Sequence, residues 1–89
     1  MDFNIGQIVI SKAGRDKGDC FIITEVIGEY IMLVDGYSRP LNNPKKKKIK
    51  HVQPTNTVIE AIKQAITTSG DIKNADFSAA IKTWRTKNS

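Results

Sequence analysis

The stretch CFIITEVIGEYIMLVDG, residues 20–36, decides the fold of this 89-residue chain. Its first half, Cys20–Ile27, is rich in β-branched residues, which are common in strands because they pack well on a pleated surface. Gly28-Glu29 follows as a two-residue connection of the kind that joins antiparallel strands. The second half, Tyr30–Val34, is again apolar and ends at the turn signal Asp35-Gly36. The stretch therefore predicts a β-hairpin.

Three further short strands are predicted on either side of this hairpin. Gln7–Ser11 precedes it, and residues 37–41 and 48–53 follow it as a short edge strand and a final strand. Five short strands joined by tight turns are typical of a small barrel or sandwich. We therefore expect residues 1–55 to form one small β domain, because a chain of this length is too short for two separate cores.

The apolar spacing changes after Pro54 from strand-like to helix-like. A first amphipathic helix is predicted with Thr55, Asn56 or Thr57 as its cap, Gly70 as its stop, and an apolar face of Val58, Ile59, Ile62, Ala65 and Ile66. A second is predicted over residues 75–86, with Asn74 as its cap and an apolar face of Phe77, Ala80, Ile81 and Trp84. Residues 56–89 should form a two-helix extension that packs on itself or on the barrel.

The positive charge is concentrated in one segment. The chain has 14 basic and 9 acidic residues, and residues 36–59 contain six of the basic residues and no acid. A run of lysines such as 45–48 is commonly a solvated loop or linker, but here it leads directly into the alternating pattern Ile49-Lys50-His51-Val52. This pattern places the lysines next to a strand of the sheet, so their positive charges should gather on one part of the surface. An acidic partner such as nucleic acid is favoured.

A second basic segment, SKAGRDKG at residues 11–18, lies between the first two predicted strands. Gly14 and Gly18 permit positive φ and a close approach of the backbone to a phosphate. The guanidinium of Arg15 can form bidentate hydrogen bonds to phosphate oxygens. Two readings remain open for this segment, an RNA contact and a solvated turn. Asp16 weakens the positive field of the loop, or pairs with a neighbouring lysine.

These segments together resemble the KOW motif, an RNA-binding signature. The closest resemblance is to the L14e family of large-subunit ribosomal proteins and its short bacterial relatives. The residues that carry it are Ala13, Gly14, Arg15 and Gly18 in an A-G-R-x-x-G loop, Val34, Asp35 and Gly36 in a turn, and Ile49, Lys50, His51, Pro54 and Thr55 in an I-K-H-x-x-P-T segment. The similarity spans residues 5–56. The helices match less specifically, being shorter than those of the eukaryotic members.

The resemblance implies a mainly β fold with α, in which a small SH3-like barrel of about five strands is followed by a C-terminal helical hairpin. It also implies a non-enzymatic protein that binds RNA, with large-subunit ribosomal RNA and neighbouring ribosomal proteins as the expected partners. From the charge and the resemblance together, the predicted RNA-binding residues are Lys12, Gly14, Arg15, Lys17, Gly18, Arg39, Lys45, Lys46, Lys47, Lys48, Lys50 and His51. Tyr37 is a further candidate for stacking on a base, whereas Tyr30 is expected to pack on the barrel.

Other function classes fit the sequence less well. Cys20 and His51 are a possible nucleophile and base, but no third orienting group is evident, and one Cys with one His is too few for a metal site. No cofactor or small-molecule substrate is expected. No apolar run reaches the length of about twenty residues that a membrane span needs, and no secretory signal is evident, so we expect a cytoplasmic protein without a membrane partner. The alternatives are a peptide-binding SH3-like module and a KOW factor of the NusG class acting off the ribosome.

Overall fold

The computed structural model describes residues 3–88 of the chain. Five strands are followed by two helices, with one turn of 3-10 helix (η1) between the last two strands. The elements are β1 (Gln7–Ser11), β2 (Cys20–Ile27), β3 (Tyr30–Val34), β4 (Lys45–Lys48), η1 (Ile49–His51), β5 (Val52–Val58), α1 (Glu60–Thr67) and α2 (Asn74–Lys87).

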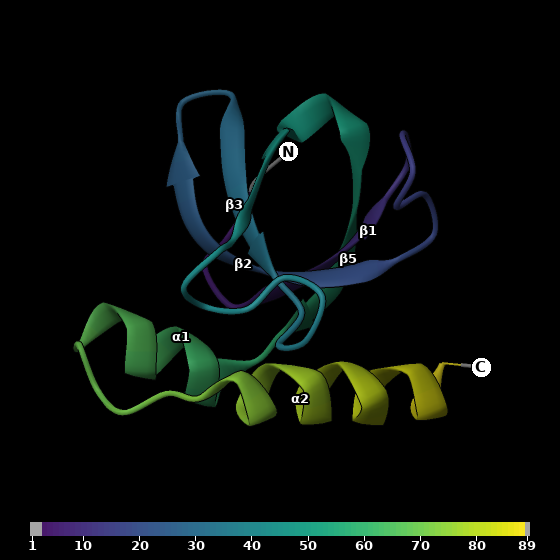
Figure 1. Cartoon of the computed structure of the whole chain (residues 1–89). Coiled ribbons are helices and arrows are strands. Elements are labelled where there is room, and N and C mark those ends of the chain that lie inside the picture. Colours follow the sequence, from purple (N-terminus) through teal and green to yellow (C-terminus); the bar gives the residue numbers. More distant parts are fainter. Residues whose placement is uncertain (1–2, 89) are drawn as a thin grey trace.

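All five strands belong to one antiparallel sheet with the order β4-β3-β2-β1-β5. The predicted hairpin is present, with Ile27 paired to Tyr30 across Gly28-Glu29. The pairing slips by one residue between Ile23 and Glu25, and such irregularities bend and twist a strand. The sheet curls above the two helices (Figure 1). The expected fold class is therefore confirmed: mainly β with α, a small SH3-like barrel followed by helices.

Both faces of the central strands are buried. Val9, Phe21 and Ile23 point into the barrel, where they form one apolar cluster with residues of β3 and β5. Ile8 and Ile22, their neighbours along the strands, point the other way into a second cluster with residues of the helices. Because successive side chains of a strand alternate between its faces, a strand buried on both faces has a continuous apolar run. This burial explains the uninterrupted apolar sequence at the start of β2.

The predicted edge strand at residues 37–41 is wrong, because this segment is a loop. Both carboxylate oxygens of Asp35 bind this loop. Oδ1 accepts hydrogen bonds from the backbone N–H groups of Tyr37 (3.0 Å) and Arg39 (2.7 Å). Oδ2 accepts one from the Ser38 hydroxyl. An aspartate that bonds to the backbone just after it offers an alternative to a strand ladder.

The predicted final strand at residues 48–53 is also wrong in its position. The lysine run is itself a strand, β4, and pairs with β3 from Tyr30 opposite Lys48 to Leu33 opposite Lys45. η1 then separates it from β5, which pairs with β1 and continues to Val58. Lysine has low β propensity, but pairing with the apolar strand β3 overrides that preference.

The first helix begins later than predicted because β5 is longer than predicted. Its cap position is Ile59, whose N–H bonds to the Gly6 carbonyl at 2.8 Å, and none of the three predicted caps serves. The helix also ends at Thr67, before Gly70, and Ser69 adopts the positive φ (57°).

The second helix is close to its prediction, and its apolar face is confirmed. Asn74 is the first residue of α2 and does not cap it, since its side-chain oxygen accepts a hydrogen bond from the N–H of Leu41 (2.8 Å). The Lys73 N–H instead donates to the Asp76 carboxylate (2.8 Å) at the N-terminus of the helix. Phe77 and Ile81 are buried against the sheet, with Ala80 and Trp84 packed beside them.

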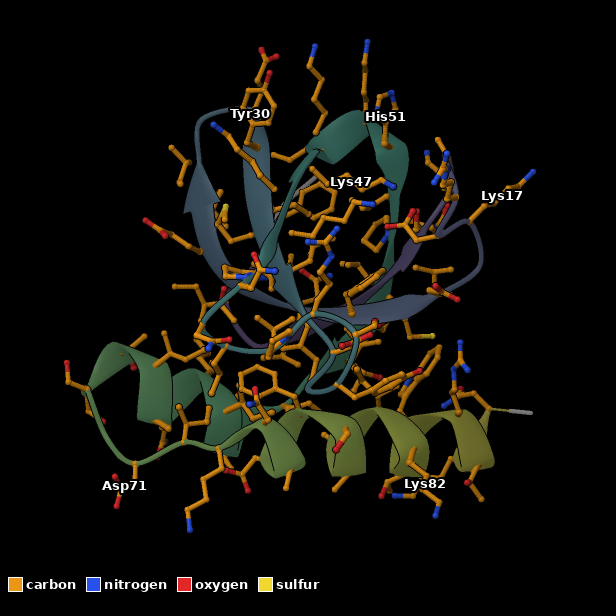
Figure 2. The ribbon with its side chains drawn as sticks, in the orientation of Figure 1. Lys17, Tyr30, Lys47, His51, Asp71 and Lys82 are labelled. Atoms are coloured by element: carbon orange, nitrogen blue, oxygen red, sulfur yellow. The ribbon has the colours of Figure 1, made fainter. Side chains whose placement is uncertain are left out.

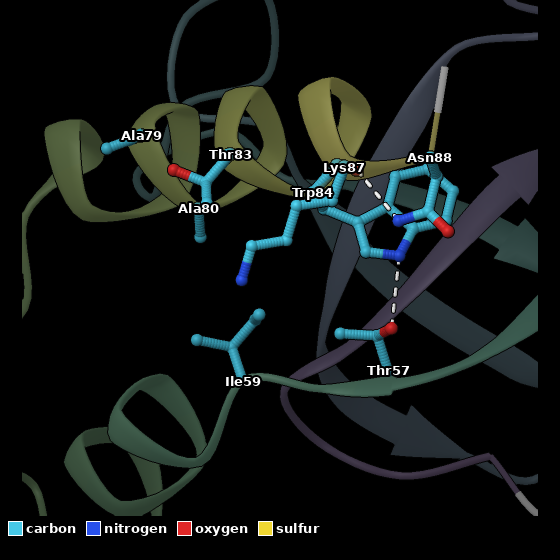
Figure 3. A pocket seen from close by; sticks show the side chains of 8 residues that line it. All are labelled: Thr57, Ile59, Ala79, Ala80, Thr83, Trp84, Lys87 and Asn88. Atoms are coloured by element: carbon cyan, nitrogen blue, oxygen red, sulfur yellow. Dashed lines mark hydrogen bonds between the residues drawn. The ribbon is translucent and has the colours of Figure 1, made fainter.

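Two contacts fix α2 on the barrel. At one end, Gly36 lies against the backbone of the helix, where a Cβ would collide with the Asn74 carbonyl. Near the other end, the Trp84 indole N–H donates to the Thr57 hydroxyl at 3.0 Å. Figure 3 shows this bond beside an open cavity of about 480 Å³, lined by Ile59, Ala80, Trp84 and their neighbours. The helices therefore pack on the barrel.

Candidate nucleic-acid interface

The four lysines of β4 divide into two pairs. Because side chains alternate along a strand, Lys45 and Lys47 share one face of β4, and Lys46 and Lys48 share the other. The first pair turns toward the loop at residues 11–18. Lys47 is the more buried of the two, with only 8% of its side chain exposed. The lysine run is therefore not one uniform patch of charge.

Lys45 and Lys47 meet a single carboxylate, that of Asp16. Lys47 Nζ lies 2.7 Å from Asp16 Oδ1 and also donates to the Ser11 hydroxyl and the Ala13 carbonyl, both at 2.7 Å. Lys45 Nζ lies 2.7 Å from Asp16 Oδ2, which accepts no hydrogen bond of good geometry but has its charge balanced by this ion pair. We call these four side chains, Ser11, Asp16, Lys45 and Lys47, the Asp16 cluster. Asp16 thus pairs with lysines, but they are Lys45 and Lys47 of β4 and not the neighbouring lysines of its own loop.

The Asp16 carboxylate stays ionised although only 12% of its side chain is exposed. Burial by itself raises the pKa of an acid, but the ion pair with Lys45 and the hydrogen bonds from Lys47 and Ser11 outweigh this effect and hold the pKa of Asp16 well below its usual value. Lys47 in turn is buried only because it has three partners, since an unpaired ammonium would be too costly to remove from water.

Lys46 and Lys48, the other pair, flank an aromatic ring. Lys46 Nζ lies 4.6 Å from the centroid of the Tyr30 ring, and Lys48 Nζ lies 5.9 Å from it. Lys48 also lies 3.8 Å from Glu29, an exposed pair of the kind that contributes little. Both ammonium groups thus remain near solvent, held over Tyr30 by cation–π attraction. Tyr37, the predicted stacking residue, is 77% exposed on another loop.

The loop at residues 11–18 is closed by backbone hydrogen bonds at its base. The Gly18 N–H bonds to the Ser11 carbonyl (2.9 Å) and the Asp19 N–H to the Asp16 carbonyl (2.9 Å). Gly14 and Gly18 have φ of 85° and 92°, as the sequence predicted. The three basic side chains of this loop, Lys12, Arg15 and Lys17, are all exposed.

The loop and η1 are neighbours in space, because the Lys12 N–H donates to the His51 carbonyl at 2.8 Å. Figure 2 shows Lys17, Tyr30 and His51 on the side of the barrel that faces away from the helices, whereas Asp71 and Lys82 lie on the helical side. One surface thus combines basic side chains from the loop, β4 and η1. We call it the basic face; it comprises Lys12, Arg15, Lys17, Lys46, Lys48, Lys50 and His51.

Arg39 lies apart from the basic face. Its loop is folded around Asp35 and continues to Leu41, which bonds to Asn74 of α2. Figure 1 shows the connection between β3 and β4 just above α2. The structure therefore places Arg39 on a loop that packs against the helices, and does not bring it to the loop that carries Arg15.

Cys20 and His51 do not form a shared site. Cys20 is buried in the cluster between the sheet and the helices, and its Sγ accepts a hydrogen bond from Arg85 Nε at 3.3 Å. Arg85 also donates to the Gly18 carbonyl (3.4 Å), a link between α2 and the basic loop that no sequence pattern indicated. Among residues 3–88, no group of three or more His, Cys, Asp or Glu side chains is placed to hold a metal ion, and no helix is long and apolar enough to cross a membrane.

Comparison with curated proteins finds relatives named large ribosomal subunit protein eL14, and no model of a protein family matches. The large ribosomal subunit protein eL14 of Methanococcus vannielii is 34% identical over 65 residues, which cover 71% of this chain and 77% of that protein. The protein of the same name from Desulfurococcus amylolyticus is 38% identical over 58 residues, which cover 63% of this chain and 59% of that protein.

A third relative extends the match into the helices. The eL14 protein of Pyrobaculum arsenaticum is 26% identical over 84 residues, covering 92% of this chain and 80% of its own length. Because the barrel makes up much less than 92% of the chain, this match includes helical residues that the sequence patterns related only weakly to the family.

Proposed function

The chain belongs to the eL14 family of large ribosomal subunit proteins, and from this premise we propose that it binds large-subunit ribosomal RNA through its basic face. As a member of a family of ribosomal proteins, it is not an enzyme. The observation that carries the proposal is the convergence of three separate segments, the loop at residues 11–18, β4 and η1, on the side of the barrel that faces away from the helices.

The chemistry of this face suits a phosphate backbone. Arg15 is exposed at the tip of a rigid loop, where its guanidinium can form two parallel hydrogen bonds to one phosphate. Lys12, Lys17 and Lys50 add point charges around it. Such contacts orient RNA without reading its sequence, so selectivity for one RNA element must come from the shape of the RNA or from unstacked bases.

The proposal assigns different roles to the predicted site residues. Lys46, Lys48 and His51 join the exposed residues of the loop as RNA contacts, and Gly14 and Gly18 shape that loop. Lys45 and Lys47 are engaged with Asp16, and Arg39 lies on another loop, so we do not assign them direct contacts. Neighbouring ribosomal proteins stay a predicted second class of partner, and the ribosome in the cytoplasm is the proposed place of action.

A matched pair of double variants tests the proposal. K12Q/K17Q removes two charges from the basic face, whereas K73Q/K82Q removes two exposed charges from the helical side. The probe is large-subunit ribosomal RNA transcribed in vitro, and binding is measured across a range of salt concentrations. Each phosphate contact contributes about 0.7–0.9 to the slope of log affinity against log salt.

We expect K12Q/K17Q to weaken binding and to reduce that slope by about 1.4–1.8, while K73Q/K82Q leaves the slope unchanged. Equal effects of the two pairs would contradict an RNA contact by the basic face.

Sedimentation of cell extract at low and high salt then tests the ribosomal assignment. Migration of the protein away from large-subunit fractions even at low salt would count against it.

A further inference from the structure

Asp16 is an acid in the middle of the loop that we propose to bind RNA. Its sequence neighbours Arg15 and Lys17 are both exposed cations. If charge alone governed binding, this carboxylate would only weaken the loop, and its removal would strengthen binding to a polyanion. The structure shows a different arrangement, because the carboxylate faces β4 and only 12% of the Asp16 side chain is exposed.

The Asp16 cluster fixes the loop to the sheet. One carboxylate reaches two lysines of β4, and Lys47 reaches the Ser11 hydroxyl and the Ala13 carbonyl on the same side of the loop. The Ser11 hydroxyl also bonds to Asp16 at 2.7 Å. The segment from residue 11 to residue 16 therefore has contacts to β4 near both of its ends. Arg15 lies within this segment, one residue before the carboxylate.

We propose that Asp16 is a positioning residue for RNA binding, which holds Arg15 and the neighbouring lysines of the loop in place by anchoring the loop to Lys45 and Lys47. The inference rests on the proposed function of the basic face. A loop that is already ordered does not lose conformational freedom when RNA binds, so the anchor should strengthen binding even though it adds a negative charge. Lys45 and Lys47 then act within the protein and do not touch the RNA.

Substitution of Asp16 separates this proposal from simple electrostatics. D16N removes one negative charge and the anchor, whereas D19N removes one negative charge from the exposed Asp19, which forms no ion pair with a lysine in residues 3–88. With in vitro transcribed large-subunit ribosomal RNA as the probe, we expect D19N to bind slightly more tightly than the unchanged protein. We expect D16N to bind about tenfold more weakly, despite carrying the same net charge as D19N.

The Lys47 side of the pair supplies a second measurement, made at a temperature at which thermal melting shows K47Q to be fully folded. K47Q should weaken binding without changing its salt slope, because no phosphate contact is lost, and D16N/K47Q should bind no worse than D16N alone. Thermal melting of each variant is recorded first. Should D16N be unfolded at the assay temperature, the slope of K47Q decides the question.

Each outcome bears on a different claim. D16N that binds as tightly as D19N overturns the positioning role but leaves RNA binding by the basic face intact. A K47Q slope that falls by about 0.7–0.9 means that Lys47 itself contacts phosphate, which also overturns it. Failure of the unchanged protein to bind the RNA overturns the proposed function and, with it, this inference.

Discussion

Replacement of Gly36 by alanine tests whether α2 is an integral part of the barrel fold. Gly36 has a φ of 90°, in the left-handed region, and a Cβ there would collide with the Asn74 carbonyl and lie 2.9 Å from the Ser78 backbone nitrogen. Two penalties therefore act together in G36A. One is backbone strain, and the other is a collision with helix backbone, which cannot rotate away as a side chain can.

The size of the effect follows from these two terms. An alanine held at positive φ costs roughly 1–2 kcal/mol, and overpacking that displaces backbone costs roughly 1–3 kcal/mol. Their sum is about 2–5 kcal/mol of the free energy of unfolding. In a domain of this size, each kcal/mol lowers the melting temperature by about 4–8 °C, so we expect G36A to melt at least roughly 8 °C below the unchanged protein.

Gly28 provides the matched control for this experiment. It also has a positive φ (59°), but a Cβ there would meet no atom within 4 Å. G28A therefore carries the backbone strain alone, and the difference between the two variants measures the collision with α2. Urea unfolding followed by circular dichroism gives both free energies. Equal losses for G36A and G28A would refute the close packing of α2 on the turn at Gly36.

Two further predictions concern the Asp16 cluster. K47Q should destabilise the fold by about 1–3 kcal/mol in urea unfolding, because it leaves the buried hydrogen-bond partners of Lys47 unsatisfied. K46Q, at the next position, should have little effect on the free energy of unfolding. Similar losses for the two variants would contradict the division of the lysines into two pairs. The second is a pH dependence. Because the pKa of Asp16 is lower in the folded protein than its ordinary value of 3.8, its ion pairs stabilise the fold fully above about pH 4, and this contribution is lost as the pH falls further. Stability of D16N should therefore decline less steeply below pH 4 than that of the unchanged protein, and parallel profiles would contradict the ion pairs.

Most of the fold could be predicted because its signals are local. The hairpin of β2 and β3 rests on β-branched residues and on a two-residue turn, and the apolar face of α2 rests on helical spacing. The two strand errors have different causes. Asp35 folds residues 37–41 into a loop by local side-chain bonds to the backbone, and β4 forms from lysines because β3 offers them a partner. Hydrophobic periodicity reveals neither of these interactions.

The candidate site could be predicted only in part, for a related reason. Composition located the surplus charge, and the glycines located the loop that lies beside it. The burial of Lys47 was missed, although a sequence signal for it exists: once residues 45–48 are treated as a strand, alternate lysines must face opposite sides. The contact of Arg85 with the Gly18 carbonyl joins residues 67 positions apart, and no local pattern predicts it.

The division of the lysines changes what the charge of the chain means. Counting residues 36–59 as one basic segment assigns six cations to an RNA partner, but Lys45 and Lys47 neutralise Asp16, and Arg39 lies on another loop. Three cations of this segment remain on the basic face, and the loop at residues 11–18 supplies three more from outside it. The charge available to the proposed RNA partner is therefore set by how two segments meet in space. Asp16 joins the loop to β4, so a single acid both reduces the number of free lysines and holds the loop that carries Lys12, Arg15 and Lys17.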